Sequence, residues 1–216
     1  MLGGRDVRRP ITASLNEKYR ELRITTRDPT KIRADEASRC TRLSYYERVD
    51  PIDPSTTETF QELLTYGLRR LFENVEKQYQ VDNLTLELSA DIILEKDLVV
   101  RVNVSNSLPG APKPQDLLYL NACLYAFDKT DGIMIYVQGD GKTSEFSVTR
   151  SAKMFEELMR RARVLSTLLK EKRVPIIEPS ESCMYCKYYS RCYIAERRET
   201  SFSIESLFGK SKDGST

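Results

Sequence analysis

Three cysteines near the C-terminus form the strongest chemical pattern in this sequence. They lie in the segment Cys183-Met-Tyr-Cys186-Lys-Tyr-Tyr-Ser-Arg-Cys192. A Cys-x-x-Cys turn places two thiolates on one side of a loop, as coordination of a soft metal requires. A tetrahedral metal site or a cubane cluster takes four ligands, so this segment predicts a site with one ligand supplied from elsewhere.

Two other cysteines are available to complete such a site. Cys40 lies among polar residues and is the natural candidate, whereas Cys123 is embedded in the apolar stretch around Leu120 and Leu124. The chain contains no histidine, which excludes His-ligated metals and the Ser-His-Asp and Cys-His mechanisms. The cysteine spacing leaves zinc and an iron–sulfur cluster both open, and a cytosolic chain makes a structural disulfide the less favoured use.

Length and charge limit the class of protein. The 216 residues suit one or two domains, and 40% hydrophobic residues suffice for a core. Residues 1–30 lack an apolar signal-peptide region and no apolar run is long enough to span a membrane, so we expect a cytoplasmic protein. The net charge is only +2, but residues 151–173 hold 7 Lys and Arg against 3 Asp and Glu. This local excess of positive charge marks either an ordinary solvent-exposed face or a surface that binds an anionic polymer.

Hydrophobic periodicity places these residues on alternating helices and strands. Helical spacing predicts helices over 36–48, 57–80, 114–127 and 151–172, and alternation predicts strands over 84–88, 91–94, 98–104, 132–137 and 144–148. The expected fold is α/β, with a small mixed sheet flanked by helices. We expect an N-terminal arm over 1–32, a domain over 33–195 and a flexible tail over 196–216.

The cysteine frame and its surroundings resemble a known family. The run Cys40-Thr-Arg-Leu-Ser-Tyr-Tyr near the start, the phrase Val174-Pro-Ile-Ile-Glu-Pro and the late cysteines are similar to RecB-like PD-(D/E)XK nucleases with an iron–sulfur cluster. The CRISPR-associated exonucleases are the most similar group, and the resemblance covers roughly residues 33–195. It implies a restriction-endonuclease-like core and a [4Fe–4S] cluster on Cys40, Cys183, Cys186 and Cys192, with zinc as the alternative. The family's usual proline after the first cysteine is Thr41 here.

The resemblance fails at the nuclease centre. Asp91 falls where the family has its first metal-binding aspartate, but the glutamate position is Arg101 and the lysine position is Asn103. Gln61 stands where the family has a histidine. Two later family positions, a Gln and a Tyr, match Tyr119 and Cys123.

One carboxylate cannot hold a catalytic divalent ion, and an arginine beside it repels one. We therefore predict an inactive centre without a catalytic metal, in which Arg101 and Asn103 both hydrogen-bond to Asp91. The alternative is a shifted register, in which the nearby carboxylates Glu87, Glu95 and Asp97 are recruited instead.

The function expected from this combination is DNA binding without catalysis. The protein would be an iron–sulfur accessory factor in DNA repair, replication or CRISPR processes, binding single strands or ends. Candidate DNA-binding residues are the cations and tyrosines of the basic segments: Arg39, Arg42, Tyr45, Arg160, Arg161, Arg163, Tyr185, Lys187, Tyr189 and Arg191. The alternatives are an active Mn²⁺- or Mg²⁺-dependent exonuclease and a scaffold subunit that does not bind DNA.

The polar tail contains one apolar island. Ile204, Leu207 and Phe208 have the spacing of the short helical peptide that binds sliding clamps, although Ser201 replaces its glutamine. The tail is therefore a candidate docking segment for a clamp or another protein. Packing on its own domain and disorder are the alternatives.

Overall fold

The computed structural model describes residues 13–17, 26–72, 75–94 and 97–193. The chain divides into two compact units, 1–178 and 179–216. The tail residues Ile204, Leu207 and Phe208, most of the expected arm over 1–32, and Glu95 lie outside the described residues. The domain boundaries expected from the sequence stay a prediction.

The first unit contains a three-stranded sheet with the order β1-β3-β2. β1 (Lys31–Arg33) runs parallel to β3 (Leu84–Ala90), and β2 (Val75–Val81) pairs antiparallel with β3. Alternate residues of β3 are buried, from Leu84 to Ala90, because this central strand faces the core with one side only.

A second sheet of four strands has the order β4-β5-β6-β7. Its strands are β4 (Ile92–Leu94), β5 (Leu98–Ser105), β6 (Asp131–Gln138) and β7 (Thr143–Thr149). The β5–β6 pair is parallel and the other two pairs are antiparallel. Asp91 is the one residue between β3 and β4, so it lies where the chain passes from one sheet to the other.

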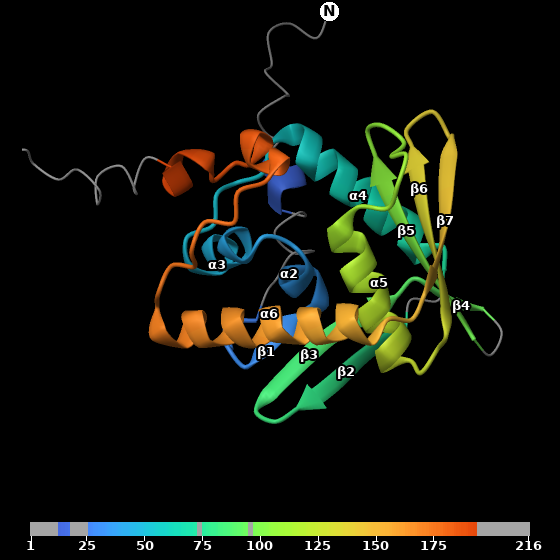
Figure 1. Ribbon diagram of the computed structural model, residues 1–216. Helices are drawn as coiled ribbons and strands as arrows, with labels where there is room; N and C mark the ends of the chain where they lie inside the picture. The colour runs from blue at the N-terminus through green and yellow to red at the C-terminus, as the bar shows by residue number, and fades with distance from the viewer. Residues whose placement is uncertain (1–12, 18–25, 73–74, 95–96, 194–216) are drawn as a thin grey trace, which may run out of the picture. The chain divides into compact units, whose positions relative to one another are not determined.

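Helices α2 to α6 pack around the sheets and around one another (Figure 1). They are α2 (Ala34–Ser38), α3 (Thr41–Val49), α4 (Thr56–Arg70), α5 (Pro114–Ala126) and α6 (Ala152–Glu171). α5 contacts β5 and β6 on one side and α6 on the other, and α6 also contacts α2 and α3. Leu120 and Leu124 of α5 and Leu158 and Leu165 of α6 are fully buried, so the core lies along these two helices.

Local sequence explains where the two site-bearing helices begin. Ser55 caps α4: its Oγ accepts from the Glu58 N–H at 3.2 Å, and Glu58 Oε2 accepts from the Ser55 N–H at 2.7 Å. Pro114 opens α5, where its missing N–H costs nothing. These caps set the first residue of each helix and therefore the positions of Arg69 on α4 and Tyr119 on α5.

The α/β fold class with small mixed sheets flanked by helices is confirmed. Two helix boundaries were wrong. The helix expected over 36–48 breaks at Arg39 and Cys40 into α2 and α3, and the helix expected over 57–80 ends at Arg70. Residues 75–81 form β2 instead, because they pair antiparallel with β3 along their whole length.

The second unit is described from Pro179 to Tyr193 and contains the 3₁₀ helix η1 (Glu181–Tyr185). A short helical segment follows at residues 189–193. No helix among the described residues combines the length and apolar character needed to cross a bilayer.

Candidate functional site

The carboxylate of Asp91 is completely buried and hydrogen-bonded at both oxygens. Arg101 Nη1 donates to Oδ1 at 2.8 Å, and the backbone N–H of Val102 donates to Oδ2 at 2.7 Å. The Arg101 side chain is 9% exposed and that of Asp91 is 0% exposed. The predicted ion pair between Arg101 and Asp91 is therefore confirmed.

A second arginine, which the sequence did not single out, completes the site. Arg69 of α4 places its Nε 3.2 Å from Asp91 Oδ1 and donates from Nη2 to Asn103 Oδ1 at 3.0 Å. The prediction that Asn103 donates to Asp91 is wrong, because its amide nitrogen instead lies 3.7 Å from Met134 Sδ. Asn103 thus positions Arg69, and Arg69 contacts the carboxylate.

The ring of Tyr119, on α5, packs against the guanidinium group of Arg101. The guanidinium carbon lies 4.1 Å from the centre of the Tyr119 ring, a short cation–π contact. The Tyr119 hydroxyl donates to the Ser89 carbonyl at 2.8 Å and accepts from the Ser89 N–H at 3.1 Å. Cys123, one turn further along α5, directs its thiol to the same carbonyl at 3.5 Å. The two family positions occupied by Tyr119 and Cys123 therefore anchor the end of β3.

Burial and charge set the protonation states in this site. Burial, together with the charge of Arg101, lowers the pKa of Arg69. Burial alone would lower the pKa of Arg101 as well, but the facing Tyr119 and Asp91 outweigh it and raise that pKa. Burial raises the pKa of the Cys123 thiol to about 12, so this thiol is neutral at physiological pH. The site is a closed ionic network beside an unreactive cysteine.

The cations that contact Asp91 are arginine side chains of the protein itself. Two guanidinium groups and one backbone N–H lie within 3.2 Å of the Asp91 oxygens. Within the described ranges, no group of three or more Asp, Glu or Cys side chains is placed to hold a metal ion. The alternative recruitment of Glu87 and Asp97 gains no support among these residues, and Glu95 is not described.

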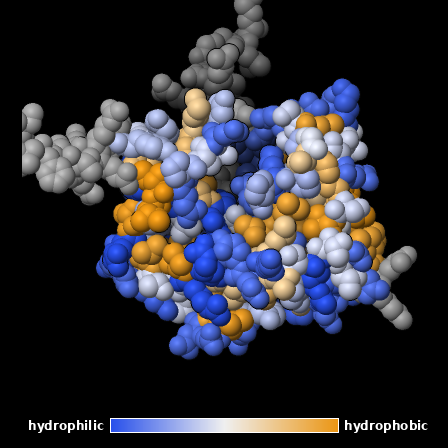
Figure 2. Space-filling view, in the orientation of Figure 1, coloured by the Kyte–Doolittle hydropathy of each residue, from blue (hydrophilic) through white to orange (hydrophobic). Residues whose placement is uncertain are grey.

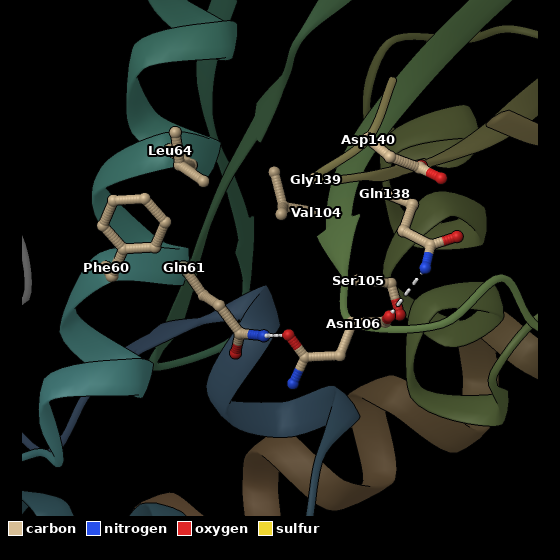
Figure 3. A pocket seen from close by; sticks show the side chains of 9 residues that line it. All are labelled: Phe60, Gln61, Leu64, Val104, Ser105, Asn106, Gln138, Gly139 and Asp140. Carbon is tan, nitrogen blue, oxygen red and sulfur yellow. Dashed lines mark hydrogen bonds between the residues drawn. The ribbon is translucent and has the colours of Figure 1, made fainter. Parts of the chain in front are cut away.

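Gln61 hydrogen-bonds away from Asp91. Its side-chain nitrogen donates to Asn106 Oδ1, across a groove of about 260 Å³ between α4 and the ends of β5 and β6 (Figure 3). Phe60 and Gln138 also line this groove. Sequence patterns could not indicate this groove, because three segments distant along the chain form it.

The cysteine donor set is chemically suited to a cluster. Cys40 is the partly exposed residue before α3 in the first unit, and Cys183, Cys186 and Cys192 are partly exposed thiols in the second. The Ser180 N–H donates to Cys183 Sγ at 3.4 Å and lowers the pKa of that thiol, which favours the thiolate that binds metal. A site built from all four cysteines stays a prediction.

Several candidate DNA-binding residues have structural roles instead. Tyr45 is 3% exposed, so it cannot stack on a base, and Arg42 is buried beside Tyr46. Arg39 pairs with Glu47 at 2.6 Å. Arg161 donates to the carbonyls of Ala37 and Arg39 at 2.9 and 2.6 Å. Arg39 and Arg161 thus link the end of α2 to α3 and α6, and Arg42 and Tyr45 are buried within α3.

Of the remaining candidates, Arg160, Arg163, Tyr185 and Tyr189 are exposed, and Lys187 and Arg191 are partly exposed. Arg160 and Arg163 on α6 have side chains that are 62% and 52% exposed, and Figure 2 shows hydrophilic residues over the face that α6 crosses. In the second unit, Tyr185 and Tyr189 are exposed, while Lys187 and Arg191 lie over the ring of Tyr188. Each unit thus presents cations at its surface, and the second adds exposed aromatic rings.

Comparison with solved structures supports the fold. The chain is similar to the crystal structure of the protein SSO0001, with a TM-score of 0.62 and 19% identity over 85% of this chain and 96% of that one. This match shows a shared fold only.

Two exonuclease structures match less well. An alkaline exonuclease from Laribacter hongkongensis has a TM-score of 0.43 and 9% identity, covering 72% of this chain and 93% of that one. A phage-related exonuclease from Haemophilus somnus has a TM-score of 0.48 and 8% identity, covering 66% and 94%. TM-scores below 0.5 do not establish a common fold. No protein-family model and no curated protein matches the chain.

Proposed function

We propose that this chain is a catalytically inactive protein of the RecB-like nuclease fold that binds single-stranded DNA as an accessory factor. The observation that carries the proposal is the contact of Arg101 and Arg69 with Asp91. At the position that matches the family's first metal-binding aspartate, the protein's own cations replace the divalent ion. A reaction that needs a metal-bound water therefore lacks a place for the metal ion at this aspartate.

An iron–sulfur cluster is part of this proposal. Cys40, Cys183, Cys186 and Cys192 would hold it, with zinc as the alternative occupant. When bound, the cluster supplies a covalent link between segments far apart in sequence. The donor set of four thiols and the Ser180 N–H donated to Cys183 support this assignment.

DNA binding would use exposed cations and rings; Arg160 and Arg163 are paired at the surface with Glu157 and Asp82, and phosphates would compete with these carboxylates. Arg160 and Arg163 stand three residues apart on α6, so they lie on one helix face and can contact successive phosphates. Tyr185 and Tyr189 would stack on bases. The binding would be electrostatic, weakly dependent on base sequence, and independent of divalent ions.

Fluorescence anisotropy of a labelled single strand at several salt concentrations, with EDTA present, tests the proposal. The logarithm of the affinity should fall linearly with the logarithm of salt concentration, by about 0.7 for each phosphate neutralised. Arg160→Ala with Arg163→Ala should reduce this slope by about 1.4, whereas Lys77→Ala on β2 should leave it unchanged. Affinity that does not respond to salt, or the absence of binding, contradicts the proposal.

A further inference from the structure

The groove between α4 and the ends of β5 and β6 has no role in the proposed function. Figure 3 looks into it: Phe60 and Leu64 of α4 form one side, Gln138 and Asp140 form the other, and Val104 lies between them. Gln61 reaches from α4 to Asn106, just after β5, and their hydrogen bond closes one end. Side chains from three segments therefore surround one space.

The lining is almost free of charge. Asp140 is the charged residue among those that line the groove, and Lys142 Nζ lies 2.7 Å from its carboxylate. A phosphate group would find no cation among the lining side chains and would face a carboxylate. The groove therefore suits a neutral group rather than the backbone of a nucleic acid.

Amide groups in the lining keep unused hydrogen-bonding capacity. Gln61 Nε2 is bound to Asn106 Oδ1, and Gln138 Nε2 donates to the Asn106 carbonyl at 3.1 Å. No bond within the described residues uses Gln61 Oε1, Asn106 Nδ2 or Gln138 Oε1. The first two lie next to each other at the end of the groove, on the side of their shared hydrogen bond that faces away from Leu64 and Val104 (Figure 3), so a ligand meets this acceptor and donor at that end.

One wall of the groove is aromatic and already open to solvent. The Phe60 side chain is 59% exposed, and Leu64, one turn later on the same helix face, is 38% exposed. A flat ligand that stacks on Phe60 would cover apolar surface that the fold leaves in water. The volume of about 260 Å³ is smaller than the roughly 300–1,000 Å³ of pockets for drug-sized ligands, so the occupant must be small.

We infer that this groove binds one unpaired nucleobase of a single-stranded DNA. The class of ligand follows from the lining: a flat, neutral ring for Phe60, with an edge on which a donor and an acceptor are adjacent for Gln61 and Asn106. Every nucleobase has such an edge. The inference rests on the proposed function, and it adds a site for a base to the sites proposed for phosphates.

The test compares two single strands of equal length, one intact and one made only of abasic sugar-phosphate units, by anisotropy with the full chain. Phe60→Ala should weaken binding of the intact strand by about 5- to 150-fold, the range that one stacked base represents. It should not change binding of the abasic strand. Tyr66→Ala is the matched control, because Tyr66 is a 43% exposed aromatic of the same helix outside the groove.

A second variant fills the groove without removing a contact. A Cβ at Gly139, on the rim, would meet no atom within 4 Å, so Gly139→Leu should fold normally and reproduce the loss seen for Phe60→Ala. If Phe60→Ala binds the intact strand as wild type does, or weakens both strands equally, the inference is overturned and the proposed function stands. If the wild-type chain binds neither strand, the proposed function fails and this inference fails with it.

Discussion

At the scale of single residues, the Arg101–Asp91 contact dominates the site. Arg101→Met leaves Asp91 with Arg69 and the Val102 N–H as its remaining partners. The substitution should therefore lower the free energy of unfolding by more than about 1 kcal/mol and by at most about 3–5 kcal/mol, the loss on breaking a buried pair completely. Urea denaturation measures this loss. The control is Arg150→Met: its pair with Asp128 lies at the surface, with Asp128 93% exposed, and should contribute less than about 1 kcal/mol.

Arg69 offers a graded comparison at the same carboxylate. Its side chain is 23% exposed against 9% for Arg101, and its Nε is 3.2 Å from Asp91 Oδ1 against 2.8 Å for Arg101 Nη1. Arg69→Met should therefore cost less than Arg101→Met. Equal losses, or a loss of under 1 kcal/mol for Arg101→Met, would show that the network does not stabilise the fold as its geometry indicates.

Cys123 gives the protein a predictable response to alkaline pH. Its thiol has a pKa of about 12 in the folded chain against an ordinary value of 9.0, because the thiolate would be buried. The unfolded chain releases this proton at lower pH, so the stability present below pH 9 is lost as pH rises toward 12. Between these limits wild type should lose about 1.4 kcal/mol per pH unit more than Cys123→Ala.

Unfolding midpoints at pH 7, 9, 10 and 11 would show this difference. Below pH 9 the two proteins should differ by a constant amount, which reflects the missing sulfur atom alone. Because the other titrating groups are common to both chains, their effects cancel in the comparison. Parallel curves up to pH 11 would mean that the thiol ionises as easily in the folded chain as in the unfolded one.

The contact between Asp91 and Arg101 was predicted from the sequence, and the contact of Arg69 was not. The family resemblance placed Asp91 and Arg101 at positions that share one site, and the observed β4–β5 register, with Ile92 opposite Val100, agrees with that placement. Arg69 could not be found in this way. Its contact depends on how α4 lies across β5, and helical periodicity gives the apolar face of a helix but not its crossing position.

At the scale of elements, the contact of β6 with α5 tolerates no extra atom. A Cβ at Gly132 would lie 2.9 Å from Leu120 Cδ2, so the Leu120 side chain would have to shift, and Leu120 is fully buried among packed neighbours. Gly132→Ala should therefore destabilise by about 1–3 kcal/mol. Leu120→Val in the same chain should recover part of the loss, as thermal or urea unfolding would reveal.

The matched control is a glycine in an open position. A Cβ at Gly67, within the exposed part of α4, would meet nothing within 4 Å. Gly67→Ala should stabilise the protein by about 0.4–1 kcal/mol, because alanine loses less backbone entropy in a helix. Destabilisation at Gly67, or no effect at Gly132, would contradict this description of the packing.

The bounds of helices and strands were predictable where no second pattern in the sequence competed with the first. Pro114 and the alternation in Leu84, Leu86 and Leu88 gave α5 and β3 close to their observed bounds. The end of α4 was missed because Leu71, Phe72 and Val75 continue the helical spacing beyond Arg70. Pairing with β3 decides the conformation of residues 75–81, and pairing between strands cannot be seen in local periodicity.

At the scale of the whole molecule, the proposed cluster makes a prediction about all five cysteines. Protein purified without oxygen should contain about four irons and four sulfides per chain. Alanine at Cys40, Cys183, Cys186 or Cys192 should remove the iron and the visible absorption, and Cys123→Ala should retain both. Loss of iron in Cys123→Ala but not in Cys40→Ala would refute the ligand assignment. Zinc without sulfide would favour the alternative metal.

The central claim is that cations of the chain have replaced the catalytic metal at Asp91, and a nuclease assay tests it most directly. Full-length, cluster-loaded protein is incubated with end-labelled single-stranded DNA and Mn²⁺, beside an Asp91→Ala variant. We predict that the wild-type protein binds the strand and leaves its length unchanged, as the variant also does. Mn²⁺-dependent shortening by the wild type that Asp91→Ala abolishes would contradict the account and establish an active enzyme.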